Sequence, residues 1–279
     1  LTKNQLTPAL YNYLEAYKKF TLLDHKEGKF KSSLKITSVN IKLQDLTSAL
    51  EWIQNAKLNF EGEINSSEEY LLLLAEYYLN SKSYGDILLI TQKDKIDKFD
   101  FNTRIELTAY RIFSLTELSL DYSEELFFLL SSLKMLDGSR ENNFVKNPLT
   151  LSFVYYVMGY VYARDSDWET AINYFNYSLK VDKSNSNYIG IADNLYAIGV
   201  AEKNLNQYES AKKSLTSAFE IYNFLDDGMN SEIAETMLLI VKYLNDNDKD
   251  GTEKRLIELL NKSSNEDVKN RIRGILQKD

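Results

Sequence analysis

The sequence between residues 153 and 225 repeats itself at an offset of 40 residues, and this repeat limits the chain to few folds. Each copy contains two stretches of helical apolar spacing that are separated by a short polar break. We therefore expect each copy to fold as two antiparallel helices. The paired positions keep the size or character of the side chain: Gly159, Trp168, Ala171, Phe175, Ser178 and Leu179 recur as Gly199, Tyr208, Ala211, Leu215, Ala218 and Phe219.

The polar breaks also carry a signal for the start of the second helix in each copy. Ser166 stands three residues before Glu169, and Asn206 stands three residues before Glu209. This spacing is typical of a capping box, in which two side chains satisfy the free amide groups at a helix start. We predict that Ser166 and Asn206 are N-caps.

Composition favours an all-helical protein. The chain has 279 residues, 44% of them hydrophobic and 27% charged, with ten glycines and two prolines. This is enough apolar sequence for a core and too little turn-forming sequence for a many-stranded architecture. We expect a single helical-repeat domain over residues 1–279. Its parts are an N-terminal helix in 1–31, degenerate repeats in 32–150, the two clear repeats in 151–225, and a C-terminal repeat with a capping helix in 226–279.

Charge and cysteine content limit the partners and the compartment. Lysine and arginine total 33 against 41 for aspartate and glutamate, a formal charge of -8, so nucleic-acid binding by this segment is disfavoured. No apolar run approaches the ~20 residues that a membrane span needs. The absence of cysteine is compatible with a cytoplasmic protein.

The N-terminal part offers three local predictions. Thr7 before Pro8 has the pattern of an N-cap followed by proline at the first helical position, so the first helix should begin there. Gly28 should break the chain after this helix. Residues 34–43 are rich in β-branched side chains, which leaves a strand open as an alternative to a helix.

The clear repeats resemble the tetratricopeptide repeat. The resemblance rests on the order of a small residue at Gly159, an aromatic at Tyr162, a small residue at Ala171, an aromatic at Phe175 and a small residue at Ser178. Such repeats have a period of about 34 residues, so the offset here implies longer helices or connections. The resemblance implies an all-α, right-handed α-solenoid in which the first helix of each hairpin lines a concave groove.

No constellation of catalytic or metal-binding residues stands out. His25 is the only histidine, and the glycine-rich motifs of phosphate-binding loops are absent. The acidic run around Asp248 and Asp250 resembles a calcium loop at first sight, but Ile257 stands where the bidentate glutamate belongs. We therefore expect a protein that is not an enzyme and that uses no cofactor and no metal.

Tyrosine is the distinctive residue of the chain, with 20 copies. Tyr156 and Tyr160 share one face of their helix, and a tyrosine offers a large rigid surface with a hydroxyl group. The alternative is that these rings only pack against the next repeat. The predicted binding residues for a peptide or partner segment are Tyr156, Tyr160, Asn194, Tyr196, Tyr110 and Lys203.

The architecture resembles the peptide-binding domain of the peptide-pheromone receptors of Gram-positive bacteria and their phages. That resemblance implies a short signalling peptide as ligand, a role in quorum sensing or transcription regulation, and Asn194 as a residue that holds the peptide backbone. A DNA-binding domain would then have to precede Leu1. The alternative is a scaffold for protein–protein assembly without a small ligand. A homodimer is compatible with either function, because solenoid ends expose apolar faces unless they are capped.

Overall fold

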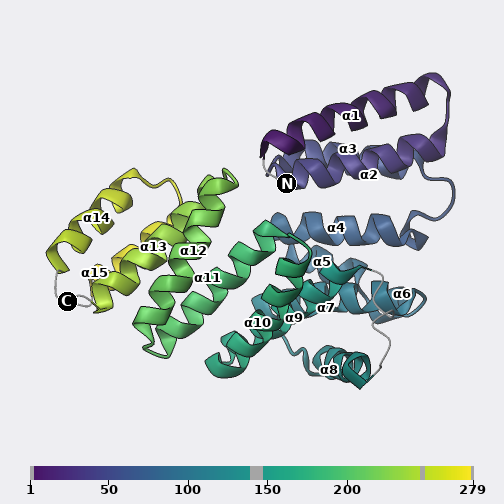
Figure 1. Ribbon diagram of the computed structural model, residues 1–279. Helices are drawn as coiled ribbons and strands as arrows, with labels where there is room; N and C mark the ends of the chain where they lie inside the picture. Colours follow the sequence, from purple (N-terminus) through teal and green to yellow (C-terminus); the bar gives the residue numbers. More distant parts are fainter. Residues whose placement is uncertain (1–2, 139–146, 246–248, 278–279) are drawn as a thin grey trace. The chain divides into compact units, whose positions relative to one another are not determined.

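The computed structural model describes residues 3–138, 147–245 and 249–277, and within these ranges the chain is helical without any β-strand. Short connections join the helices (Figure 1). Internal contacts divide the chain into two compact units, Leu1–Thr150 and Leu151–Asp279. The all-α fold class is confirmed.

The first unit combines long helices with short ones. Its elements are α1 (Lys3–Leu22), α2 (Lys26–Lys42), α3 (Leu46–Asn59), the 3-10 helix η1 (Ile64–Ser66), α4 (Glu68–Asn80), α5 (Tyr84–Ile90), α6 (Lys93–Ile96), α7 (Phe101–Glu117) and α8 (Ser123–Gly138). α2 packs against α1 and α3, while α4 packs against α2, α5 and α7. α7 also contacts α6 and α8, so it holds the second half of this unit together.

Two predictions for the first helices are wrong. α1 begins at Lys3, and Pro8 lies inside it. A proline conflicts only with the carbonyl group four residues earlier, so near a helix start it removes a single hydrogen bond. Burial of Leu6 stabilises the added turn. Gly28 lies inside α2, where a Cβ atom would collide with the Phe20 ring, so this glycine permits a close helix crossing instead of breaking the chain.

Residues 34–43 belong almost entirely to α2, which decides the open choice in favour of a helix. Ile36, Val39 and Ile41 are buried there against the neighbouring helices. Burial of these β-branched side chains outweighs their small intrinsic penalty in a helix.

The second unit is the more regular one. Its elements are α9 (Pro148–Arg164, in this unit from residue 151), α10 (Trp168–Ser184), α11 (Tyr188–Asn204), α12 (Tyr208–Phe224), α13 (Gly228–Asn245), α14 (Lys249–Lys262) and α15 (Glu266–Leu276). From α10 to α15 each helix packs against the next one along the chain. α15 also contacts α13 and buries Val268 and Ile272.

The turns of this unit recur every 20 residues with one residue in the left-handed region. Ser166, Ser186, Asn206 and Asp226 have φ values of 63°, 53°, 59° and 58°. The amide after each of them bonds to a carbonyl five residues back, as Asp167 N does to Tyr162 O at 2.9 Å. This is the helix-ending pattern in which a left-handed residue returns the chain.

The predicted capping boxes are therefore displaced by one residue. The N-cap of α10 is Asp167, whose side chain accepts a hydrogen bond from Thr170 N, and the N-cap of α12 is Gln207. Ser166 and Asn206 end the preceding helices instead. Asparagine tolerates the left-handed region and also suits N-caps, so residue type alone does not separate the two roles.

The small residues of the repeat have the predicted function in packing. A Cβ atom on Gly159 would lie 2.6 Å from the Phe175 ring, and one on Gly199 would lie 2.6 Å from the Leu215 side chain. Ala171 and Ala211 are fully buried at the same crossings. The 40-residue repeat is thus a pair of closely packed helical hairpins, α9–α10 and α11–α12.

Among the residues that the structure describes, no helix combines the length and the apolar character needed to cross a membrane.

Candidate functional site

The candidate site lies on α9 and α11, which are the first helices of the two clear hairpins. α9 contributes Tyr156 and Tyr160, and α11 contributes Asp193, Asn194 and Tyr196. Asp193, Tyr160 and Tyr196 all act electrostatically on the Tyr156 hydroxyl, so these side chains lie near one another. The structure thus brings together residues from two helices that the sequence separates by about 40 positions.

Tyr156 combines a packed ring with an available hydroxyl group. Its ring lies against Phe175 of α10, with the ring centroids 5.5 Å apart. Burial, followed by the nearby Asp193 carboxylate, raises the pKa of Tyr156, so the hydroxyl stays protonated and can donate. This hydroxyl makes no hydrogen bond within the described part of the chain, and it is not fully enclosed.

Asp193 is the acidic centre of the site. The Tyr222 hydroxyl on α12 donates to Asp193 Oδ1 at 2.6 Å. Burial raises the pKa of Asp193 to about 7, and the Asp227 and Asp182 carboxylates add to the effect. None of the groups that act on Asp193 is a cation. Its Oδ2 makes no hydrogen bond among the described residues, so an uncompensated carboxyl group is available to a ligand.

Asn194 is 1% exposed and lies in the joint between α10 and α11. Its Nδ2 is within hydrogen-bond distance of Ser178 Oγ (2.9 Å), Asp182 Oδ2 (2.9 Å) and Gly190 O (2.8 Å). An amide nitrogen has two hydrogens, so these three acceptors share them. Asn194 Oδ1 is buried and has no hydrogen-bond partner in the described residues.

Asn194 belongs to a buried polar network that joins α9, α10 and α11. Ser152 and Ser178 join α9 to α10 through hydroxyl groups 2.9 Å apart, and Asn187 donates to Asp182 Oδ1 at 2.8 Å. Burial raises the pKa of Asp182, while its hydrogen bonds act in the opposite direction. The network fixes the position of α11 relative to α9 and α10, and so it fixes the positions of the site residues that these helices carry.

Tyr196 occupies the position in α11 that Tyr156 occupies in α9. Its ring packs against the core that contains Met237 and against Ala218. Its hydroxyl is buried without a hydrogen-bond partner among the described residues. Burial raises the pKa of Tyr196, and Arg271 of α15 acts in the opposite direction.

The two other predicted residues lie elsewhere. Tyr110 belongs to α7 of the first unit, where it is buried, and burial together with Glu76 and Glu106 raises its pKa. Lys203 lies near the end of α11, partly exposed and engaged with a neighbouring group. The structure therefore brings together Tyr156, Tyr160 and Tyr196, whereas the Asn194 side chain lies in the joint between α10 and α11. The role of all six residues in binding stays a prediction.

The sequence reasoning missed Asp193 and Tyr222. The 40-residue offset holds a signal for both: Asp193 replaces Phe153 of the first copy, and Tyr222 replaces Asp182. Asn194 likewise stands where the first copy has a valine. For Asp193 and Asn194, the signal is a polar residue at a position where the other copy is apolar.

The described residues contain no group of three or more side chains able to hold a metal ion, and residue 248 of the acidic run lies outside the described residues.

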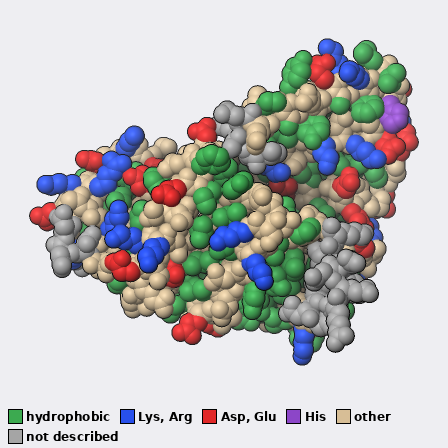
Figure 2. Space-filling view, in the orientation of Figure 1, with side chains coloured by type: hydrophobic (Ala, Val, Ile, Leu, Met, Phe, Trp, Pro, Cys, Tyr) green, Lys and Arg blue, Asp and Glu red, His purple; other side chains and the backbone are tan. Residues whose placement is uncertain are grey.

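On the face shown in Figure 2, hydrophobic side chains, tyrosine included, gather over α11 and α12, whereas charged side chains are concentrated over α14 and α15. The visible surface of α11 and α12 is thus suited to contacts with apolar groups.

Comparisons with known proteins define the class of fold. No protein-family model and no curated protein matches the sequence. Solved structures do match. A Rap protein complexed with the Competence and Sporulation Factor aligns over 97% of this chain and 78% of its own, with a TM-score of 0.60 and 12% identity. The apo form of RapI aligns over 96% and 80%, with a TM-score of 0.54 and 14% identity.

BtubC (BKLC) from P. vanneervenii aligns over 76% of this chain and 84% of its own, with a TM-score of 0.50 and 14% identity. Identities this low establish the fold alone. The chain has the fold class of the tetratricopeptide-like α-solenoids, as its repeat predicts. The expected resemblance to the peptide-receptor architecture is confirmed at the level of the fold by the two Rap structures.

Proposed function

We propose that the second unit is a non-enzymatic module that binds a short signalling peptide, or an equivalent segment of a partner, along α9 and α11. In this proposal the protein acts in the cytoplasm as the sensor part of a peptide-responsive regulator. The likeness in fold to a Rap protein that was solved with the Competence and Sporulation Factor supports it.

The observation that carries the proposal is unused hydrogen-bonding capacity on these two helices. Tyr156 Oη and Asp193 Oδ2 make no hydrogen bond within the described residues and are not fully enclosed, so a ligand can reach them. Asn194 Oδ1 and Tyr196 Oη are buried without a partner among these residues. A buried polar group without a partner costs about 1–3 kcal/mol. A peptide backbone carries one donor and one acceptor per residue, so it can satisfy such groups as it binds.

The charge of the site predicts the kind of peptide. The Asp227 and Asp182 carboxylates act on Asp193, and no cation is among the groups that act on it. A ligand that carries a lysine or arginine side chain, or a free amino terminus, would supply the missing positive charge. We expect basic peptides to bind more tightly than neutral peptides of the same length.

The test is a thermal-shift screen of the intact chain against a positional-scanning library of free pentapeptides, followed by calorimetric titration of the best one. A ligand that binds only the folded state raises the melting temperature. Tyr156→Phe, which removes only the hydroxyl group, should weaken binding about tenfold.

Tyr177→Phe is the matched control, because Tyr177 is exposed on α10 and lies outside the site. The control should bind like the unmodified protein. Equal losses in the two variants, or no shift with any basic peptide pool, would contradict the proposal.

One observation favours the alternative of an assembly scaffold. Tyr188 and Phe224 are 49% and 68% exposed, and their ring centroids lie 6.4 Å apart at the end of the α11–α12 hairpin. Exposed aromatic pairs are typical of protein interfaces. If Phe224→Ala abolishes a stable complex recovered from cells while Tyr156→Phe leaves that complex intact, the scaffold function is favoured over the peptide-binding function.

A further inference from the structure

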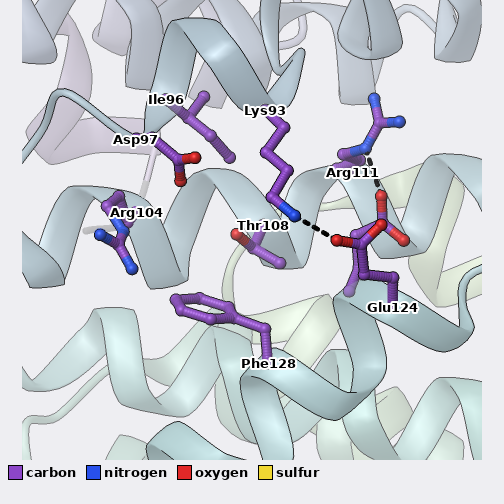
Figure 3. Close-up of a pocket in the computed structure, with 9 residues that line it drawn as sticks. Lys93, Ile96, Asp97, Arg104, Thr108, Arg111, Glu124 and Phe128 are labelled. Atoms are coloured by element: carbon purple, nitrogen blue, oxygen red, sulfur yellow. Dashed lines mark hydrogen bonds and ion pairs between the residues drawn. The ribbon is translucent and has the colours of Figure 1, made fainter.

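A cleft in the first unit is lined by α6, α7 and α8 (Figure 3). Ile96 of α6 and Phe128 of α8 contribute apolar surface, and Thr108 of α7 faces the space between them. Small-molecule sites combine an apolar lining with a few polar groups. The cleft meets this description, and nothing in the proposed function uses it.

Two of the three cations of the cleft are already neutralised. Lys93 of α6 forms an ion pair with Glu124 at the start of α8, and Arg111 Nε pairs with Glu125 Oε1 at 2.7 Å. Arg111 Nη1 also approaches the carbonyl oxygen of Leu88 at 3.4 Å. These pairs join α6 and α7 to α8 and leave little charge for a ligand.

Arg104 is the third cation, and it differs from the other two. Its guanidinium group lies over the Phe128 ring, 5.1 Å from the ring centroid. No carboxylate of the described residues forms an ion pair with it. Stacking on an aromatic ring holds the planar guanidinium in place, and that group binds carboxylates through two parallel hydrogen bonds.

Two further polar groups line the cleft beside Arg104. Thr108 is 4% exposed, and its hydroxyl makes no hydrogen bond among the described residues. The Asp97 carboxylate projects toward the cleft from the end of α6 (Figure 3). Lys93 interacts with it electrostatically, but no ion pair of Asp97 forms among the described residues. The cleft thus presents one unpaired positive charge, one hydroxyl group and one unpaired negative charge around an apolar surface.

We propose that this cleft binds an amino acid with an apolar side chain through its α-carboxylate. Arg104 holds the carboxylate and Thr108 donates a hydrogen bond to it, while Ile96 and Phe128 contact the side chain. The ligand is a free amino acid or the C-terminal residue of a peptide, since both carry this carboxylate. Asp97 favours the free amino acid, whose ammonium group it can pair with.

Three probes distinguish these sources in calorimetric titrations of the intact chain. L-phenylalanine represents the free amino acid, N-acetyl-L-phenylalanine represents a peptide C-terminus, and N-acetyl-L-phenylalaninamide lacks the carboxylate. We expect at least one of the two acids to bind about tenfold more tightly than the amide or better. Tighter binding of L-phenylalanine, lost in Asp97→Asn, identifies the free amino acid as ligand; equal or tighter binding of the acetylated acid identifies a C-terminus.

Variants then test the assignment to Arg104. Arg104→Met keeps the apolar stem and should weaken binding of the acid about tenfold, whereas Lys134→Met removes an exposed cation of α8 outside the cleft and should have no effect. Thr108→Val supplies a second variant should Arg104→Met fold poorly. Equal binding of acids and amide by the unmodified protein, or full binding by Arg104→Met, would overturn the proposal.

Discussion

Both units are built from packed helices, but the helix lengths and turns are more regular in the second unit than in the first. In the second unit, the helices α9 to α13 are 17 or 18 residues long, and a left-handed residue ends the turn every 20 residues. In the first unit, α5 has 7 residues and α6 has 4. The short helices of the first unit leave a cleft between α6, α7 and α8.

This difference indicates how a candidate ligand site can be recognised in each unit. In a regular repeat, candidate binding residues are visible as departures from the repeat, as Asp193 and Asn194 are. In an irregular region, the candidates are residues that line a cleft and form no ion pair, as Arg104 does among the described residues.

The regular packing of the second unit should be sensitive to loss of its central ring. Phe175→Ala should destabilise the protein by about 3–5 kcal/mol, because Phe175 is 2% exposed and fills the crossing opposite Gly159. Hydrogen exchange should show the loss of protection in residues 151–277, with residues 3–138 little affected. Phe127→Ala, at an exposed ring on α8, is the control. Equal loss of protection in both units would contradict the division into two units.

The buried network behind the site should depend on Asn194. Asn194→Ala leaves Ser178 and Asp182 without their amide partner, and should cost about 1–3 kcal/mol in the free energy of unfolding. Asn176→Ala on the exposed face of α10 should change it by no more than about 0.5 kcal/mol. Urea unfolding measures both. A negligible effect of Asn194→Ala would show that the network does not stabilise the α10–α11 joint.

The carboxyl group of Asp193 should make stability depend on pH. Its folded-state pKa, about 7, lies above the ordinary value of 3.8, so the folded protein binds a proton that the unfolded chain releases between these values. Asp193 therefore lowers stability progressively as pH rises from about 4 to about 7. Glu76 and Glu106, with pKa values raised by burial, act in the same direction.

Asp193→Asn should remove its share of this dependence while keeping an acceptor for Tyr222. We expect the variant to gain about 1–4 kcal/mol relative to the unmodified protein between pH 5 and pH 8, since one pKa unit corresponds to about 1.4 kcal/mol. Urea unfolding at the two pH values measures this difference. An identical pH dependence in both proteins would show that Asp193 is not the buried acid described here.

Much of the fold follows from local sequence. The helical hairpins and the close crossings at Gly159 and Gly199 could be predicted, because apolar spacing and small side chains act within one repeat. The helix starts could not, because asparagine suits both an N-cap and a left-handed turn residue, and Ser166 takes the left-handed turn position although serine is typical of N-caps. The prediction that the first helix begins at Pro8 was wrong for a similar reason, since a proline is tolerated early in a helix as well as at its start.

The candidate site was only partly predictable. Tyr156 and Tyr196 occupy matching repeat positions, so their grouping follows from the repeat. The role of Asp193 depends on Tyr222, which is 29 residues away, and on burial, neither of which a local sequence pattern indicates. The Arg104 cleft depends on the shortness of α6, which composition does not reveal.

The most direct test of the account is the pKa of Asp193 itself, measured by carbon-detected nuclear magnetic resonance of its carboxyl group. The measurement compares the free protein with the protein saturated by the best basic peptide from the screen. The account predicts a pKa near 7 in the free protein and a clear decrease on binding, because a cation beside the carboxylate favours its charged form. An Asp193 pKa that is the same in the free and the bound protein would contradict the account.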